Sequence, residues 1–172
     1  DEYLRTSVDC LIAAAIRIKP AIIHAASNYE TALPALIAAR RLGISFCYEV
    51  RGLWEFTAAS KKPRWEQTER FKLDRLLETH TAIHADAVFT LTKALADELI
   101  SRGVIVEKIH LLPNAVNLSF FKPVERDHVL ASDLKIPADS FVCGYIGSVV
   151  AYEGLDDLIR AWVQVVECRP DS

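Results

Sequence analysis

The chain has 172 residues, of which 51% are hydrophobic, and a formal net charge of −3 at pH 7. Because 20 Lys and Arg stand against 23 Asp and Glu, there is no basic field, which excludes non-specific binding to nucleic acid. The four cysteines form no CxxC pair, and no apolar run reaches the roughly 18 residues of a membrane-spanning helix, so we expect a cytoplasmic protein.

Helices and short apolar strands alternate from the start of the chain. The periodicity of apolar residues predicts a helix over residues 3–18 and a second helix that begins after Ser27 or Asn28 and ends at Gly43. Short apolar runs predict strands over residues 21–25 and 44–50.

The same alternation continues after the segment Arg51-Gly-Leu-Trp-Glu-Phe56 and the loop that follows it. The patterns predict a charged helix over residues 64–84, a strand over 87–92, a helix over 93–102 and a strand over 108–112. Regular alternation of buried strands with helices is typical of an α/β fold, and we expect a Rossmann-like, doubly wound parallel sheet.

The rhythm breaks after Pro113, and a strand over 141–146, a turn at Gly147 and a helix from near Glu153 follow. The unpaired N–H groups at the start of such a helix favour an anion, although a turn without any ligand is the alternative. We expect the end of a first domain over residues 1–122, a linker over 123–139 and the beginning of a second domain over 140–172. Since the chain also contains no Met, we expect it to be an internal fragment.

Four stretches, in their order and spacing, resemble the family 4 glycosyltransferases of the GT-B fold, in which two Rossmann-like domains face each other across a cleft. They are Ile22-Ile-His-Ala-Ala-Ser27 with the helix after it, Arg41 to Glu55, Ala85 to Thr92 leading to Ile109 to Asn117, and Gly144-Tyr-Ile-Gly-Ser148 with Tyr152-Glu-Gly-Leu155. Within them, Tyr48-Glu-Val-Arg-Gly-Leu-Trp-Glu55 is similar to bacterial transferases of exopolysaccharide assembly.

The resemblance implies transfer of a sugar from a nucleotide diphosphate sugar to a glycan or lipid-linked acceptor, with retention and without metal or cofactor. It assigns donor binding to five residues of the second domain: Gly147, Ser148, Tyr152, Glu153 and Gly154. Ser148 and Glu153 stand where the family usually has Arg and Lys, so the backbone N–H groups would carry more of the binding. No two glutamates are eight residues apart, so we expect the catalytic Glu-x7-Glu pair beyond this chain and no turnover by the chain alone.

The carboxyl ends of the first-domain strands are where open α/β sheets bind ligands, and we expect the acceptor there. The candidates are His24, Ser27, Asn28, Arg51, Trp54 and Asn114. Each has a structural alternative: a packed role for His24, helix capping for Ser27 and Asn28, an ion pair of Arg51 with Glu49 or Glu55, packing of Trp54 against the domain and a turn at Asn114.

Two further hypotheses concern the first domain. His80 and His84 share a helix face but lack a third ligand nearby, so we expect no metal there. Residues 61–72 combine cations with Trp65 and Phe71 and could rest on an anionic inner membrane, although interleaved acids favour a solvated helix. A homodimer, a non-catalytic α/β binding module and a GT-B sugar-nucleotide epimerase remain open alternatives.

Overall fold

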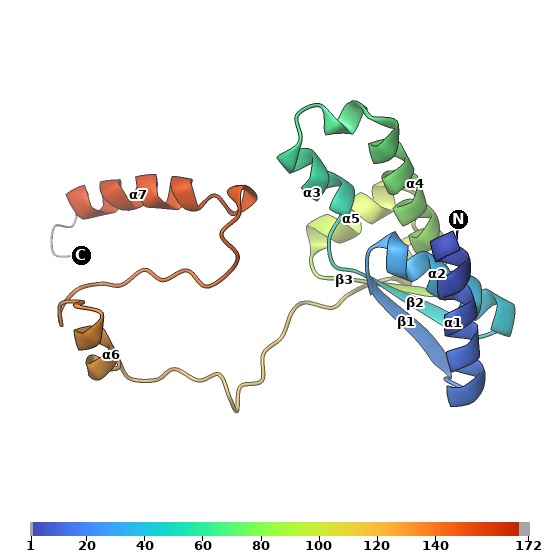
Figure 1. Cartoon of the computed structure of the whole chain (residues 1–172), viewed down its shortest axis with the longest axis horizontal. Coiled ribbons are helices and arrows are strands. Elements are labelled where there is room, and N and C mark those ends of the chain that lie inside the picture. The colour runs from blue at the N-terminus through green and yellow to red at the C-terminus, as the bar shows by residue number, and fades with distance from the viewer. Residues whose placement is uncertain (1, 169–172) are drawn as a thin grey trace. The chain divides into compact units, whose positions relative to one another are not determined.

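The apolar runs of the first 115 residues form a four-stranded parallel sheet in the order β1-β2-β3-β4 (Figure 1). The computed structural model describes residues 2–168, and the chain divides into two units, one ending at Ala115 and one beginning at Val116. The strands are β1 (Ile22–Ser27), β2 (Ser45–Val50), β3 (Ala87–Thr90) and β4 (Ile109–Leu111). The predicted α/β class with a parallel sheet is therefore confirmed.

Helices precede and connect these strands. They are α1 (Glu2–Ile18), α2 (Tyr29–Leu42), α3 (Trp54–Lys61), α4 (Glu69–His84) and α5 (Lys93–Ser101), with 3-10 turns η1 (Trp65–Gln67) and η2 (Val106–Lys108). Because strand order follows chain order, right-handed crossovers place α2, α4 and α5 on the same face of the sheet. Helix α1 packs against α2.

The two faces of the sheet differ in burial because successive side chains of a strand point to opposite sides. One face carries the row Ala25, Tyr48 and Val88, which is buried in the core under the helices. On the other face the register aligns Glu49, Phe89 and His110, which are only partly buried or exposed. Polar and aromatic side chains of the second face thus remain accessible.

Helix α4 begins where a hydroxyl side chain caps it. Thr68 Oγ1 accepts a hydrogen bond of 3.2 Å from the backbone N–H of Phe71. This cap separates η1 from α4, so the continuous helix predicted from residue 64 is wrong in its first turn.

Loss of the cap is expected to weaken α4. Replacing Thr68 by Ala should lower the free energy of unfolding by about 1 kcal/mol, because one N–H group of the first turn loses its acceptor. Urea denaturation followed by circular dichroism measures the change. Thr68→Ser keeps the hydroxyl and is the matched control; equal stabilities of the Ser and Ala variants would contradict the capping role.

Helix α3 lies where the sequence predicted a loop. Its Glu55 is buried and forms an ion pair of 2.7 Å with Arg102, which follows α5. Because this contact joins residues that are far apart in the chain, no local pattern in residues 54–61 could predict it.

The second unit contains α6 (His128–Asp133), the 3-10 turn η3 (Ala151–Glu153) and α7 (Leu155–Cys168). Helix α6 lies inside the predicted linker and is capped by Asp127, whose carboxylate accepts from Leu130 N–H at 2.9 Å. Residues 141–146, predicted as a strand, have no regular secondary structure, so this prediction is wrong. A parallel strand needs a neighbour for its hydrogen bonds, and no strand occurs among the described residues from Val116 to Cys168.

Two boundary predictions complete the comparison. Helix α7 begins at Leu155, two residues after the predicted start. The sequence Glu167-Cys-Arg-Pro-Asp-Ser172, with a proline after the last helical residues, predicts the end of this helix, and residues 169–172 of it lie outside the described residues. Across residues 2–168, every helix is too short or too polar to cross a bilayer.

Candidate functional site

The carboxyl ends of the four parallel strands meet at one edge of the sheet, and most of the predicted acceptor residues lie there. His24 is within β1, and Ser27 ends it. Asn28 precedes α2, Arg51 follows β2, Trp54 opens α3 and Asn114 lies three residues after β4.

Glu49 joins two of these candidates. Its Oε2 lies 3.3 Å from His24 Nε2 and its Oε1 lies 3.6 Å from Arg51 Nε. The Glu49 side chain is 18% exposed, whereas those of His24 and Arg51 are 45% and 55% exposed. The ion pair considered for Arg51 is therefore present with Glu49, and it orients Arg51 and His24 while leaving about half of each side chain open to solvent.

A row of rings continues this group across the sheet. The centroids of His24 and Phe89 are 5.8 Å apart, and those of Phe89 and His110 are 5.6 Å apart. The ring planes are tilted by 32° and 37° in these two pairs. Aromatic rings beside a carboxylate and a guanidinium suit a ligand with both apolar faces and hydroxyl groups, as a sugar ring has.

The Ser27–Asn28 turn is held by a group that the sequence analysis missed. Asn28 is buried at the N-cap position of α2, as one alternative held, but its side chain makes no capping hydrogen bond. Instead, Glu78 from α4 accepts a hydrogen bond of 2.9 Å from the backbone N–H of Tyr29, the first residue of α2. Ser27 has a φ of 92°, a left-handed conformation that is strained for any residue except glycine.

The position of Glu78 on α4 could have revealed it. The buried residues of α4 are Phe71, Glu78, Thr81 and Ala82, which recur at helical spacing. A carboxylate on the apolar stripe of a helix is thus a detectable signal.

Burial also changes the acidity of Glu78. It raises the pKa of Glu78 from its ordinary value of 4.5 to about 7, an effect that the hydrogen bonds from Tyr48 and Tyr29 oppose.

The two remaining acceptor candidates are exposed. Trp54 does not pack into the domain as one alternative held, because its side chain lies largely in solvent. Asn114 is exposed one residue before the end of the first unit. Both are available for contact, and their roles stay predictions.

The predicted donor loop lies in the second unit and is shaped by its glycines. A Cβ at Gly147 would lie 2.5 Å from the Tyr145 hydroxyl, which donates a 3.0 Å hydrogen bond to the Ser148 carbonyl. Gly154 has a φ of 68°, and its carbonyl accepts from Leu158 N–H at 3.0 Å. The left-handed backbone favours glycine at position 154, and a side chain at position 147 would have to displace the Tyr145 ring, with or without a ligand.

The charge around this loop is acidic. Asp156 and Asp157 occupy the first turn of α7, where they form ion pairs of 3.1 and 2.7 Å with Arg160. Glu153 precedes them. The loop therefore presents backbone N–H groups rather than a cluster of cations.

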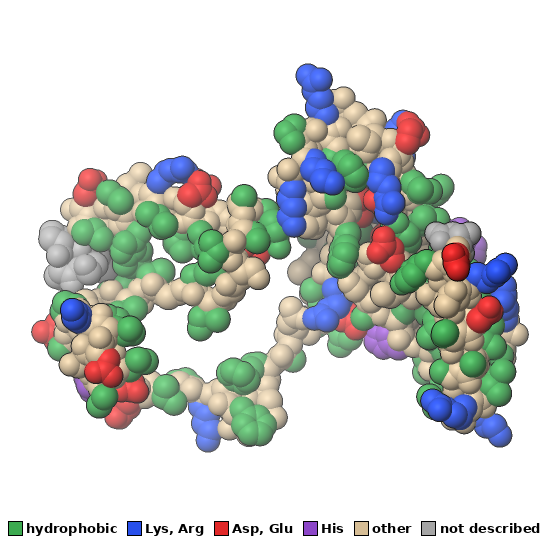
Figure 2. All heavy atoms as spheres, in the orientation of Figure 1, with side chains coloured by type: hydrophobic (Ala, Val, Ile, Leu, Met, Phe, Trp, Pro, Cys, Tyr) green, Lys and Arg blue, Asp and Glu red, His purple; other side chains and the backbone are tan. Residues whose placement is uncertain are grey.

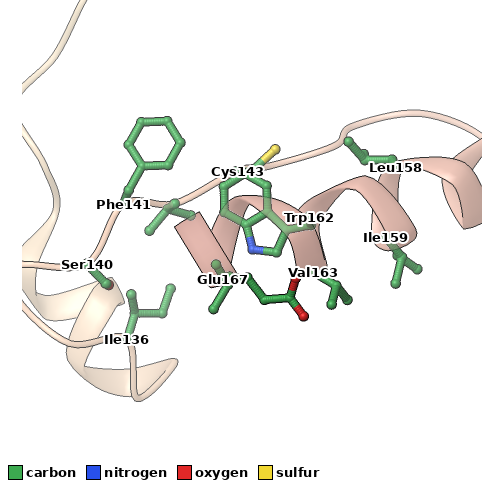
Figure 3. A pocket seen from close by; sticks show the side chains of 11 residues that line it. Ile136, Ser140, Phe141, Cys143, Leu158, Ile159, Trp162, Val163 and Glu167 are labelled. Carbon is green, nitrogen blue, oxygen red and sulfur yellow. The ribbon is translucent and has the colours of Figure 1, made fainter. Parts of the chain in front are cut away.

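An apolar groove of about 640 Å³ runs along α7 (Figure 3). Phe141 and Trp162 stack with ring centroids 6.0 Å apart, and Cys143, Ile159 and Val163 also line the groove. Such a lining suits the packing of apolar groups, so this groove is not the predicted phosphate site.

His80 and His84, four residues apart on α4, contact each other. The ring centroids are 4.1 Å apart with the ring planes tilted by 34°, and His84 Nδ1 lies 2.8 Å from the His80 carbonyl oxygen, which occupies that nitrogen. Throughout residues 2–168, no three His, Cys, Asp or Glu side chains converge in a way that could hold a metal ion.

Comparison with known proteins adds to this geometry. Residues 5–115 match the family model of the Glycosyl transferase 4-like domain. The chain belongs to this family. D-inositol 3-phosphate glycosyltransferase 1 of Catenulispora acidiphila is 35% identical over 88 residues, which are 51% of this chain and 21% of that protein. The chain thus spans about a fifth of the length of this relative.

One solved structure shares the fold of this Glycosyl transferase 4-like chain. The alignment with sucrose-phosphate synthase from Thermosynechococcus elongatus covers 94% of this chain and 39% of the synthase chain, with a TM-score of 0.66 and 19% identity. The likeness concerns the α/β architecture of the GT-B type. The S. aureus MnaA-UDP co-structure matches 64% of the chain and 27% of its own at 20% identity, with a TM-score of 0.49 that is too low to bear on the fold.

Proposed function

We propose that the chain is part of a retaining glycosyltransferase that moves a hexosyl group from a nucleotide diphosphate sugar to an acceptor hydroxyl. The family match over residues 5–115 is the observation that carries this proposal. The exposed edges of His24 and Arg51, oriented by Glu49 at the carboxyl end of the sheet, support an acceptor site there. In this proposal residues 1–122 belong to the acceptor-side domain, 123–139 link the domains and 140–172 begin the donor-binding domain.

The donor loop would act on the leaving group. As the glycosidic bond breaks, negative charge accumulates on the nucleotide diphosphate, and fixed donors around it lower the barrier. The backbone N–H groups between Gly147 and Gly154 would supply part of these donors, whereas Ser148 and Glu153 add no positive charge. The acidic first turn of α7 leaves charge neutralisation to groups outside this loop.

The finer assignment is to bacterial surface polysaccharide assembly in the cytoplasm, with a glycan or lipid-linked acceptor. The likeness of residues 48–55 to exopolysaccharide transferases supports it. An acceptor attached to a lipid would require the acceptor-side domain to work at the inner membrane.

Calorimetry with UDP, GDP and ADP tests the proposal on this chain and on a longer protein that includes more of the parent sequence. Binding of one nucleotide by the longer protein, followed by sugar transfer, is the expected result. Isomerisation of the donor sugar instead would indicate the epimerase. Absence of binding by both folded proteins would favour the non-catalytic module.

Arg51 is expected to contribute to acceptor use. In the longer protein, Arg51→Ala should lower kcat/KM for the acceptor by roughly 10- to 100-fold, because a charge-assisted hydrogen bond contributes about 1.5–3 kcal/mol. Steady-state transfer assays measure the loss. Arg41→Ala, an exposed arginine at the end of α2, is the control; an equal effect of the two substitutions would remove Arg51 from the site.

Residues 61–72, which we propose as the membrane-binding surface, carry several cations. Figure 2 shows several Lys and Arg side chains at the end of the first unit that carries α3 and the start of α4. Arg70 and Lys72 are paired with Asp74 and Glu69, and Lys62 lies 4.4 Å from the centre of the Trp65 ring. Arg64, at the tip between α3 and η1, is exposed.

Vesicle binding tests this surface. Because each cation near an anionic surface contributes about 1 kcal/mol, combined replacement of Lys61, Lys62 and Arg64 by Ala should weaken binding to phosphatidylglycerol vesicles by roughly 100-fold. Sedimentation with these vesicles measures it, and neutral phosphatidylcholine vesicles should bind neither protein. Combined replacement of the exposed Arg5, Arg17 and Arg41 is the matched control; equal loss in both variants would contradict a specific surface.

A further inference from the structure

A buried carboxylate connects three elements next to the carboxyl edge of the sheet. Glu78 of α4 is 1% exposed and accepts hydrogen bonds from the Tyr29 backbone N–H, at 2.9 Å, and from the Tyr48 hydroxyl. The Tyr48 hydroxyl also lies 3.2 Å from the carbonyl oxygen of Ser27. Tyr48 on β2 thus stands between Glu78 and the strained last residue of β1.

The hydrogen bonds among Glu78, Tyr48 and the Ser27 carbonyl depend on whether Glu78 is protonated. A tyrosine hydroxyl has one proton to donate, and here two acceptors lie within its reach. While Glu78 is ionised, it takes this proton in a charge-assisted hydrogen bond, and the Ser27 carbonyl loses the Tyr48 donor. Once Glu78 is protonated, its own O–H can donate to Tyr48 Oη, and the Tyr48 O–H then donates to the Ser27 carbonyl.

The two arrangements hold the turn after β1 differently. Ser27 is in a left-handed conformation that a non-glycine residue keeps only when its surroundings enforce it. A hydrogen bond to its carbonyl is one such restraint. The same turn leads to the buried Asn28 and to the first N–H group of α2, which Glu78 caps.

We propose that Glu78 and Tyr48 are positioning residues, which set the Ser27–Asn28 turn through a hydrogen-bond relay whose direction follows the protonation of Glu78. The assignment of this turn to the acceptor side rests on the proposed function. Neither residue touches a reacting atom; they act through the backbone of Ser27.

The groups around Glu78 set the pH at which the hydrogen-bond relay reverses, and this pH is near neutral. The groups that face it are Tyr48 of β2, the Tyr29 N–H of α2, Glu55 of α3 and Arg102 after α5. Glu55 and Arg102 pair with each other at 2.7 Å, so their opposite charges largely cancel. Burial then dominates and raises the pKa of Glu78 to about 7.

Carbon-13 NMR of the 172-residue chain from pH 4.5 to 9 tests the relay without any sugar or nucleotide. The expected result is that Glu78 Cδ, Tyr48 Cζ and the Ser27 carbonyl carbon shift with one common midpoint. In Glu78→Gln, the amide N–H can donate to Tyr48 Oη at every pH, so the Ser27 carbonyl should stay at its low-pH shift. In Tyr48→Phe, it should stay constant near its high-pH shift.

Each other outcome overturns the relay. A Ser27 carbonyl that stays constant while Glu78 titrates would disconnect the two, and a Glu78 that does not titrate between pH 4.5 and 9 would remove the switch. Amide spectra identify a variant that fails to fold, and the wild-type titration then decides alone.

The longer protein links the relay to function. Its acceptor KM should vary with pH at the Glu78 midpoint, and Glu78→Gln should make that KM independent of pH while kcat changes less. Absence of transfer by the wild-type protein would refute the proposed function and leave the NMR result standing. Active wild-type protein whose KM profile is unchanged by Glu78→Gln would refute the positioning role.

Discussion

Replacing Arg102 by Met is expected to lower the free energy of unfolding by about 3–5 kcal/mol, because it leaves a buried carboxylate without its partner. The Arg102 side chain is 1% exposed and that of Glu55 is 2% exposed, with 2.7 Å between Nη1 and Oε1. Arg102 Nε also donates to Glu98 at 2.9 Å. Equilibrium urea denaturation, followed by fluorescence and circular dichroism together, measures the loss.

A second pair in the same region provides the control. Arg75 lies 3.5 Å from Glu98 and is 43% exposed, so Arg75→Met should cost no more than about 1 kcal/mol. Adding Glu55→Gln to Arg102→Met should recover part of the stability, because it removes the unpaired buried charge. If Arg102→Met and Arg75→Met are equally stable, burial of the Glu55–Arg102 pair does not have the assigned energetic role.

Glu78 is expected to make the stability of the protein fall as the pH rises through neutrality. Its pKa is raised from 4.5 to about 7 by burial, so between these values the folded chain binds more protons than the unfolded chain. The stabilisation is therefore complete below about pH 4.5 and is lost as the pH rises through about 7. From pH 5 to pH 8, wild type should lose about 2–3 kcal/mol relative to Glu78→Gln.

Denaturation of both proteins at several pH values measures this difference. The contributions of the other titratable groups are the same in both proteins and therefore cancel. One such group is Asp86, whose pKa is lowered by its hydrogen bond to Arg40 and which acts at acidic pH in both proteins. Glu30→Gln, at an exposed position on α2, is the control for removing one carboxylate from the surface. A stability difference between wild type and Glu78→Gln that is constant with pH would contradict a buried, titrating Glu78.

Much of the first unit could be predicted because its elements follow from local patterns. The apolar runs ending at Ser27 and Val50 form strands, and Gly43 ends α2 in the left-handed conformation with a φ of 67°. The order of buried strands and helices then determines a parallel sheet. These features depend on residues that are near one another in the chain.

The errors concern elements whose state depends on distant partners. Helix α3 contains Glu55, whose burial depends on Arg102, 47 residues later. Residues 141–146 have the composition of a strand, but pairing with a neighbour decides whether a strand forms. Composition alone could not indicate either outcome.

The candidate site shows the same division. Arg51 and its possible partner Glu49 could be found because a charged residue in an otherwise apolar strand stands out. Glu78 was missed because it lies within a charged stretch, where only its spacing from Phe71 and Thr81 marks it as buried. The Tyr48 contact with the Ser27 carbonyl joins two neighbouring strands, and no pattern in the sequence indicates it.

The agreement between strand order and chain order also bears on synthesis. Each strand pairs with the one made just before it, and the ends of successive strands are about 20 to 40 residues apart. At about 5–20 residues per second, a ribosome would supply the next strand within seconds. The edges of β1, β2 and β3 that receive the next strand could otherwise pair with a neighbouring nascent chain, and they would therefore be covered soon after they emerge.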